Sequence, residues 1–126
     1  MVLDTSALVA ILFREPGSAE LEAKIENADI VLVGAPTLFE TSMILERESD
    51  GRANLADLLR ATGTTVVAFT EEHQASALSA FVRFGKGRHP ARLNILDCMS
   101  YAIADVAHLP LLYTGNDFSK TDIEAA

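Results

Sequence analysis

Four acidic residues of this 126-residue chain stand beside apolar segments: Asp4, Glu40, Asp97 and Asp117. Asp4 follows the apolar start of the chain, and Asp117 follows another apolar run at residues 111–113. Carboxylates brought together raise one another's pKa, and a bound cation relieves that repulsion. Carboxylate oxygens suit Mg²⁺ or Mn²⁺, with water and phosphate oxygens completing the coordination. The four acids therefore predict a divalent-metal site and hydrolysis of phosphodiester bonds.

Each of these acids also has an ordinary structural interpretation. Asp4 can cap the helix that follows it, and Glu40 is favourable in the first turn of a helix. Asp97 can complete a capping arrangement with Asn94, and aspartate is common in turns such as the one at Asp117. The metal-site interpretation rests on all four together, because strand ends and the starts of the following helices share one edge of a parallel sheet.

The elements that must position these acids are short apolar runs alternating with helical patterns, without a linker or an internal repeat. We expect strands at residues 1–3, 30–33, 64–69 and 111–113. We expect helices at residues 5–13, 18–28, 36–49, 53–61, 71–83 and 94–106. Mostly continuous apolar strands are typical of a parallel sheet with helices on both faces. The sequence thus predicts an α/β fold, a three-layer α/β/α sandwich with a central mostly parallel sheet, as a single domain over residues 1–126.

Asp97 is the acid that this arrangement places least directly. Two helices separate the third expected strand from the fourth, so the loop at residues 84–93 is expected to carry the chain back to the edge where the other acids lie. An extended chain spans about 3.3 Å per residue, which makes this loop just long enough.

Composition excludes several classes of protein. The single cysteine, Cys98, and three scattered histidines rule out a disulfide scaffold and a zinc finger. The apolar start has no basic region and is interrupted by Asp4, so we expect neither a signal peptide nor a membrane span, and a cytoplasmic protein. A net charge of −8 repels nucleic acid, so a nucleic-acid substrate requires a local positive charge or a metal.

One segment supplies such a local positive charge. Residues 73–96 contain no acid and hold four of the ten basic residues, namely Arg83, Lys86, Arg88 and Arg92. This cluster is expected to guide nucleic-acid phosphates towards the acidic site. The alternative is a solvated loop without a binding role.

Several segments together resemble PIN (PilT N-terminal) domain ribonucleases, and most closely the VapC toxins of bacterial VapBC toxin–antitoxin systems. They are VLDTSA at 2–7, PTLFE at 36–40, FGKGRHPA at 84–91, LNILDC at 93–98 and GNDF at 115–118. The resemblance covers essentially the whole chain, in order. It implies an Mg²⁺-dependent endoribonuclease, with Mn²⁺ as a possible substitute, that is silenced by a cognate VapB-type antitoxin. It also implies a homodimer and a toxin–antitoxin hetero-oligomer.

The resemblance carries over to individual residues as well. Asp4, Glu40, Asp97 and Asp117 match the acidic quartet of the family. Ser6 matches a hydroxyl position near the metal, and Thr114 is a weaker equivalent. Asn116 departs from the pattern, because related toxins often have an acid at the position before the fourth aspartate.

Two other classes of function are weighed against this one. A phosphoacceptor receiver module fits the size and the expected fold, but residues 64–69 are followed by Thr70 where a receiver needs an aspartate. A PIN-like binding module without catalysis should have lost acids, and all four are present.

Apolar residues near the start of the chain bear on the partner. They either form a groove for an amphipathic antitoxin helix or are buried in the core. These residues are Leu8, Leu12, Phe13, Leu21 and Ile25.

Overall fold

The central sheet of the protein, in a computed structural model that describes residues 1–126, is four-stranded and entirely parallel. Its strands lie in the order β3–β2–β1–β4, so the first strand of the chain is at the centre. Val2 pairs with Leu32 on one side and with Leu111 on the other. The strands are β1 (Val2–Leu3), β2 (Leu32–Gly34), β3 (Thr65–Val67) and β4 (Leu111–Leu112).

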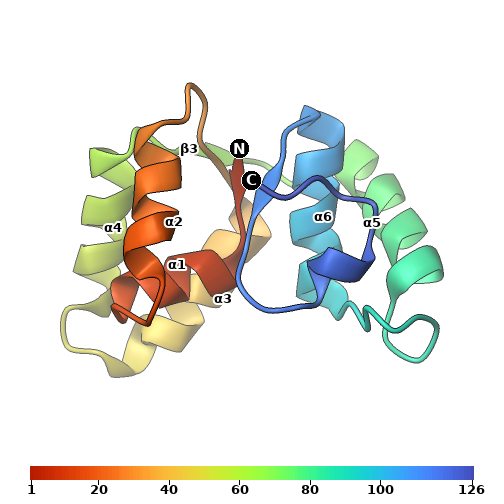
Figure 1. The fold of residues 1–126 in the computed structure, drawn as a ribbon, viewed down its shortest axis with the longest axis horizontal. Helices are drawn as coiled ribbons and strands as arrows, with labels where there is room; N and C mark the ends of the chain where they lie inside the picture. Colours follow the sequence, from red (N-terminus) through yellow and green to blue (C-terminus); the bar gives the residue numbers. More distant parts are fainter.

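Helices cover both faces of the sheet (Figure 1), which confirms the three-layer α/β/α sandwich. The helices α1, α2 and α4 lie on one side of the strands, and α5 and α6 lie on the other. The helix α3 packs against both α1 and α6. The helices are α1 (Thr5–Leu12), α2 (Ser18–Glu26), α3 (Ala35–Ile44), α4 (Gly51–Ala61), α5 (Glu71–Phe84) and α6 (Ile95–Ala107), with short 3₁₀ turns η1 (Leu45–Arg47) and η2 (Phe118–Lys120).

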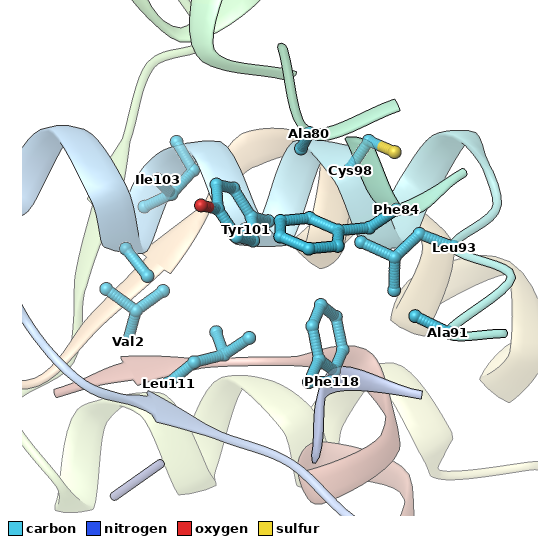
Figure 2. Packing of buried hydrophobic residues seen from close by; sticks show 11 residues of the cluster. Val2, Ala80, Phe84, Ala91, Leu93, Cys98, Tyr101, Ile103, Leu111 and Phe118 are labelled. Atoms are coloured by element: carbon cyan, nitrogen blue, oxygen red, sulfur yellow. The ribbon is translucent and has the colours of Figure 1, made fainter. Parts of the chain in front are cut away.

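Two hydrophobic cores lie on the two faces of the sheet, because successive side chains of a strand point to opposite faces. Val2 and Leu111 belong to the core under α5 and α6, where Phe84, Tyr101 and Phe118 pack together (Figure 2). The next residue of each strand, Leu3 and Leu112, belongs to the core under α1, α2 and α4. The neighbouring strands β1 and β4 are therefore packed on both faces.

The apolar residues near the start of the chain belong mainly to this second core. Leu8 and Ile25 are buried in it, and Leu12 and Leu21 pack against it. Of the five, only Phe13 is substantially exposed, at 42%. Core burial, rather than an open groove, is therefore what the structure shows for these residues.

Three expected element boundaries are wrong for identifiable reasons. The strand expected at 64–69 is only three residues long, and Val66 is 47% exposed because β3 is an edge strand. The helix expected at 36–49 ends at Ile44 and continues as the 3₁₀ turn η1. The helix expected at 53–61 begins two residues earlier, at Gly51.

The loop at residues 84–93 does not cross the molecule, contrary to expectation. Its two ends are hydrogen-bonded to each other, from Lys86 N to Leu93 O at 2.9 Å and from Leu93 N to Phe84 O at 3.0 Å. The C-terminal end of α5 therefore lies beside the N-terminal end of α6, and the two helices pack side by side along their length (Figure 1). The helix α5 itself carries the chain to the edge at which α6 begins.

None of the helices combines the length and the apolar character that a membrane span requires.

Candidate active site

Asp4 occupies the carboxyl end of the central strand and caps α1. Its Oδ2 accepts hydrogen bonds from the backbone N–H of Ser6 at 2.9 Å and from the Ser6 hydroxyl at 2.7 Å. The Ser6 Oγ in turn accepts from the backbone N–H of Thr114, beyond the end of β4, at 3.0 Å. Ser6 thus joins the ends of two neighbouring strands. Asp4 is buried, and because both bonds go to Oδ2, its Oδ1 is left for another ligand.

Glu40 reaches the same edge from α3. The buried Thr5 hydroxyl donates to Glu40 Oε2 at 2.5 Å, which places this carboxylate next to the start of α1. The helix α3 is held against α6 by a buried hydrogen bond between the hydroxyls of Thr37 and Ser100, 2.9 Å apart. Thr5 was not among the predicted site residues, although the two successive hydroxyl residues after Asp4, Thr5 and Ser6, were a signal for it.

Asp97 is both a helix-capping residue and a member of the acidic group. Its Oδ2 accepts from the backbone N–H of Asn94 at 2.7 Å, and Asn94 Oδ1 accepts from the backbone N–H of Asp97 at 3.0 Å, a reciprocal capping box. The pKa of Asp97 is raised to about 6, mainly by burial and in addition by the charges of Asp4, Asp117 and Glu40, against the lowering effect of the Asn94 N–H. The structure therefore brings the other three acids within electrostatic reach of Asp97.

Asp117 is the exposed member of the group. It lies just before η2, and its carboxylate makes no hydrogen bond within the protein. Thr114 contributes its backbone N–H rather than its hydroxyl to the contact with Ser6. Asn116 contributes its backbone oxygen to a hydrogen bond from Ser119 Oγ at 2.8 Å, and its side chain is exposed. The side chains of Thr114 and Asn116 thus make no hydrogen bond within the protein, unlike that of Ser6.

The four carboxylates fit a hard divalent cation in their chemistry. None of them forms an ion pair, because the ion pairs of the protein are Arg52–Glu46, Arg60–Asp57 and Arg83–Asp122. As they stand, no three acidic, histidine or cysteine side chains lie close enough together to form a ready-made metal cage. A group of uncompensated carboxylates with only oxygen donors suits Mg²⁺ or Mn²⁺ and would draw together around it.

The four basic residues predicted to bind RNA do not form one group. Lys86, Arg88 and Arg92 line an open hollow of about 440 Å³, together with Gly87, His89 and Pro90 and no acid. The Arg88 guanidinium lies 5.1 Å from the centre of the Phe81 ring. Arg83 is separate, because it pairs with Asp122 and lies 4.5 Å from the centre of the Phe84 ring.

Comparison with known proteins agrees with this geometry. The family model "PIN domain" matches residues 1–124. Ribonuclease VapC36 of Mycobacterium tuberculosis is 42% identical over 127 residues, which cover 98% of this chain and 91% of the relative. Ribonuclease VapC of Mycolicibacterium smegmatis is 39% identical over 127 residues, which cover 99% of this chain and 98% of the relative.

Two solved structures share the fold. Mycobacterium tuberculosis VapC20, described as a sarcin–ricin loop cleaving toxin, has a TM-score of 0.76 at 20% identity and covers 99% of this chain and 97% of its own. A toxin–antitoxin complex from Klebsiella pneumoniae has a TM-score of 0.72 at 15% identity and covers 96% of this chain and 92% of its own.

A parallel α/β/α sandwich with four acids at one edge of its sheet, together with the match over residues 1–124, defines the class: the chain belongs to the PIN domain family. Within that family it is a ribonuclease of the VapC group, the toxins of VapBC toxin–antitoxin systems. This membership excludes the phosphoacceptor receiver.

Proposed function

We propose that this protein is an endoribonuclease that hydrolyses RNA phosphodiester bonds with Mg²⁺ or Mn²⁺ held by Asp4, Glu40, Asp97 and Asp117. The observation that supports the proposal is the environment of Asp97, whose pKa is raised by burial and by the charges of Asp4, Asp117 and Glu40, while none of these acids has a basic partner. An uncompensated cluster of this kind is unfavourable in a fold unless a cation uses it.

The residues around the acids act by holding them in place. Ser6 holds Asp4 through Oδ2, Thr5 holds Glu40, and the backbone of Asn94 holds Asp97. Hydrogen bonds of this kind fix the direction in which a carboxylate offers its free oxygen. A divalent ion bound there supplies activation of water for attack and stabilisation of charge on the scissile phosphate. Thr114 and Asn116, whose side chains are uncommitted, are placed to contact the RNA or its water shell.

Lys86, Arg88 and Arg92 are proposed to bind RNA phosphates away from the bond that is cut. The hollow that they line contains no acid, so a phosphate meets only positive charge there. The loop returns to α6 immediately before Asn94, the residue that holds Asp97. An RNA phosphate bound in the hollow would therefore lie next to the loop that leads into α6 and Asp97.

A VapB-type antitoxin is the proposed partner protein. The net charge of −8 favours a partner segment with positive charge, because complementary charge steers association and penalises wrong partners. The proposed assembly is a toxin–antitoxin hetero-oligomer built on a toxin homodimer. We expect the protein to act in the cytoplasm, where its RNA substrate is made.

The proposed homodimer uses an apolar face formed by α3, α5 and α6. Phe39 and Met43 of α3, Leu78 of α5 and Ile95 of α6 are between 52% and 71% exposed. A groove of about 350 Å³ between α5 and α6 adds Phe69, Phe81 and Met99 to this face. Exposed apolar surface of this extent marks an interaction site.

Sedimentation of the Leu78→Glu variant tests this face. We expect the variant to be monomeric at a concentration at which the wild type is a dimer, because a charge in the interface would be desolvated without a partner. Ile30→Glu, which changes another apolar side chain of 54% exposure, is the matched control and should remain a dimer. A dimeric Leu78→Glu protein would show that the two copies associate elsewhere.

The nuclease proposal is tested by cleavage of RNA by the purified protein. We expect cleavage with Mg²⁺ or Mn²⁺ and none in excess EDTA, and a loss of at least about 100-fold in the Asp4→Asn variant because a metal ligand is weakened. Asp57→Asn, which removes an exposed acid paired with Arg60 on α4, should keep full activity. Undiminished cleavage in EDTA, or by Asp4→Asn, would refute the metal-dependent mechanism.

A further inference from the structure

The segment that carries Asp117 is held at its two ends rather than at Asp117 itself. It leaves β4 after Leu112, and its start is fixed where the Thr114 N–H donates to Ser6 Oγ. Phe118 is buried in the core beside Tyr113, with 5.1 Å between the ring centres. Asp117 lies between these attachments with an exposed, unbonded side chain. Its distance from the other acids therefore depends on where the rest of the segment is attached.

The first attachment of this segment beyond Phe118 that uses a side chain and reaches other elements is Asp122. Its Oδ1 accepts from the hydroxyl of Tyr101 on α6 at 2.7 Å, and its Oδ2 accepts from the Arg83 guanidinium on α5. One carboxylate thus ties the C-terminal segment to both helices that cover this face of the sheet. We call Asp122, Tyr101 and Arg83 the tail clamp.

Tyr101 makes this attachment specific. It is only 4% exposed and lies in the core with Phe84 and Phe118 (Figure 2). A buried tyrosine hydroxyl requires a hydrogen-bond partner, and Asp122 is the side chain that accepts from it. Burial opposes ionisation of Asp122, but the hydrogen bonds from Arg83 and Tyr101 outweigh it and lower the pKa of this carboxyl. The carboxylate is therefore charged and doubly bonded at neutral pH.

We propose that Asp122 is a positioning residue for the metal site, acting with Tyr101 and Arg83 to hold the segment that presents Asp117. The inference rests on the proposed role of Asp117 as a metal ligand. It also assigns Arg83 a different task from its neighbours in sequence: this guanidinium is committed to Asp122, whereas Lys86, Arg88 and Arg92 face an acid-free hollow. Neutralising Asp122 weakens the side-chain attachment of the segment to α5 and α6 without touching any of the four site acids, while Glu124 and Ala126 stay hydrogen-bonded through their backbone to Leu111.

Two measurements on metal-free and Mn²⁺-titrated protein test the clamp. Amide hydrogen exchange follows residues 114–121, where the Thr121 N–H is bonded to Phe118 O at 2.9 Å. Calorimetric titration gives the dissociation constant for Mn²⁺. In Asp122→Asn and in the milder Tyr101→Phe, we expect faster exchange in this segment, and in Asp122→Asn an Mn²⁺ affinity weakened by about tenfold, the lower end of what lost support around metal ligands costs.

Asp105→Asn is the matched control. Asp105 also accepts a side-chain hydrogen bond between α5 and α6, from Ser76 Oγ at 2.6 Å, but it does not touch the C-terminal segment. This variant should leave both the exchange at 114–121 and the Mn²⁺ affinity unchanged. If Asp122→Asn also leaves both unchanged, or if Asp105→Asn reproduces its effects, the clamp proposal is overturned.

Asp117→Asn separates this inference from the proposed function. Weaker Mn²⁺ binding in Asp117→Asn with normal binding in Asp122→Asn would refute the clamp and leave the metal site standing. Normal Mn²⁺ binding in Asp117→Asn would instead remove Asp117 from the proposed ligands, and with it the reason for positioning it.

Discussion

Two sets of acidic residues in this protein differ in what surrounds their charge. Away from the sheet edge, Glu46, Asp57 and Asp122 each pair with an arginine. At the edge where β1 and β4 end, Asp4 and Asp97 receive hydrogen bonds from hydroxyl or backbone donors and no cation at all. Neutral donors orient a carboxylate without cancelling its charge. The carboxylates at this edge therefore keep their negative charge in fixed positions, where a bound cation can use it.

Basic residues show the same division. Arg83 is committed to Asp122, while Lys86, Arg88 and Arg92 line a hollow without acids, on a loop that ends at the start of α6. Uncommitted negative and positive charge thus lie close together along the chain. A polyanion that needs a cation for its hydrolysis can use both.

The largest expected effect is on the pH dependence of RNA cleavage, through the acidic group. Because the pKa of Asp97 is raised to about 6, most of this carboxylate is ionised at pH 7, and only about a tenth of it is at pH 5. At a constant metal concentration well below saturation, we expect cleavage to fall about tenfold between these values, since a protonated carboxyl is a poor ligand. Initial rates on a labelled RNA measure it.

Competition between proton and metal provides the control. Raising the Mn²⁺ concentration should move the acidic limb of the profile to lower pH, because metal binding displaces the proton from Asp97. A profile that is flat from pH 7 to pH 5, or that does not move with Mn²⁺, would contradict the role of Asp97.

The salt dependence of RNA binding tests whether the unpaired basic residues differ from Arg83 in contacting phosphates. If Lys86 and Arg88 contact phosphates, the double variant Lys86→Gln, Arg88→Gln should reduce the slope of log binding constant against log salt by about 1 to 1.5, at roughly 0.7 per phosphate on a single strand. Arg83→Gln should leave the slope unchanged, because Asp122 already occupies that guanidinium. Filter binding in metal-free buffer avoids cleavage. If Arg83→Gln reduces the slope as much as the double variant does, Arg83 contacts RNA despite its ion pair with Asp122.

Much of the site could be predicted from sequence because its geometry follows from topology. Asp4 and Asp117 follow strands, and parallel strands end at a shared edge, so their approach needed no knowledge of side-chain packing. Asp97 was also predicted correctly as a member of the acidic group, but for the wrong reason, since α5 and not the loop at 84–93 brings the chain to that edge. The direction in which α5 runs after the short edge strand β3 is set by tertiary packing, so no local sequence pattern predicts it.

Contacts between distant residues could not be predicted in the same way. The pairing of Arg83 with Asp122 joins two solvent-exposed side chains from α5 and the C-terminal segment, and each looks like an ordinary surface charge in the sequence. Leu8 and Ile25 presented the opposite problem, because an apolar helical pattern does not reveal whether a core or a partner covers it. Tertiary packing decided both.

Thermal melting with and without Mn²⁺, on the wild type and Asp97→Asn, tests the central claim that uncompensated carboxylates await a cation. Without metal, the wild type carries the desolvation and the repulsion that raise the pKa of Asp97, so the variant should melt at a higher temperature. Saturating Mn²⁺ should reverse the order, because binding at a hundredfold excess over the dissociation constant adds about 2.7 kcal/mol to the wild type and much less to the variant. If Asp97 serves only as a cap for α6, its replacement should destabilise the protein equally in both conditions, by about 1 kcal/mol, and that result would contradict the account.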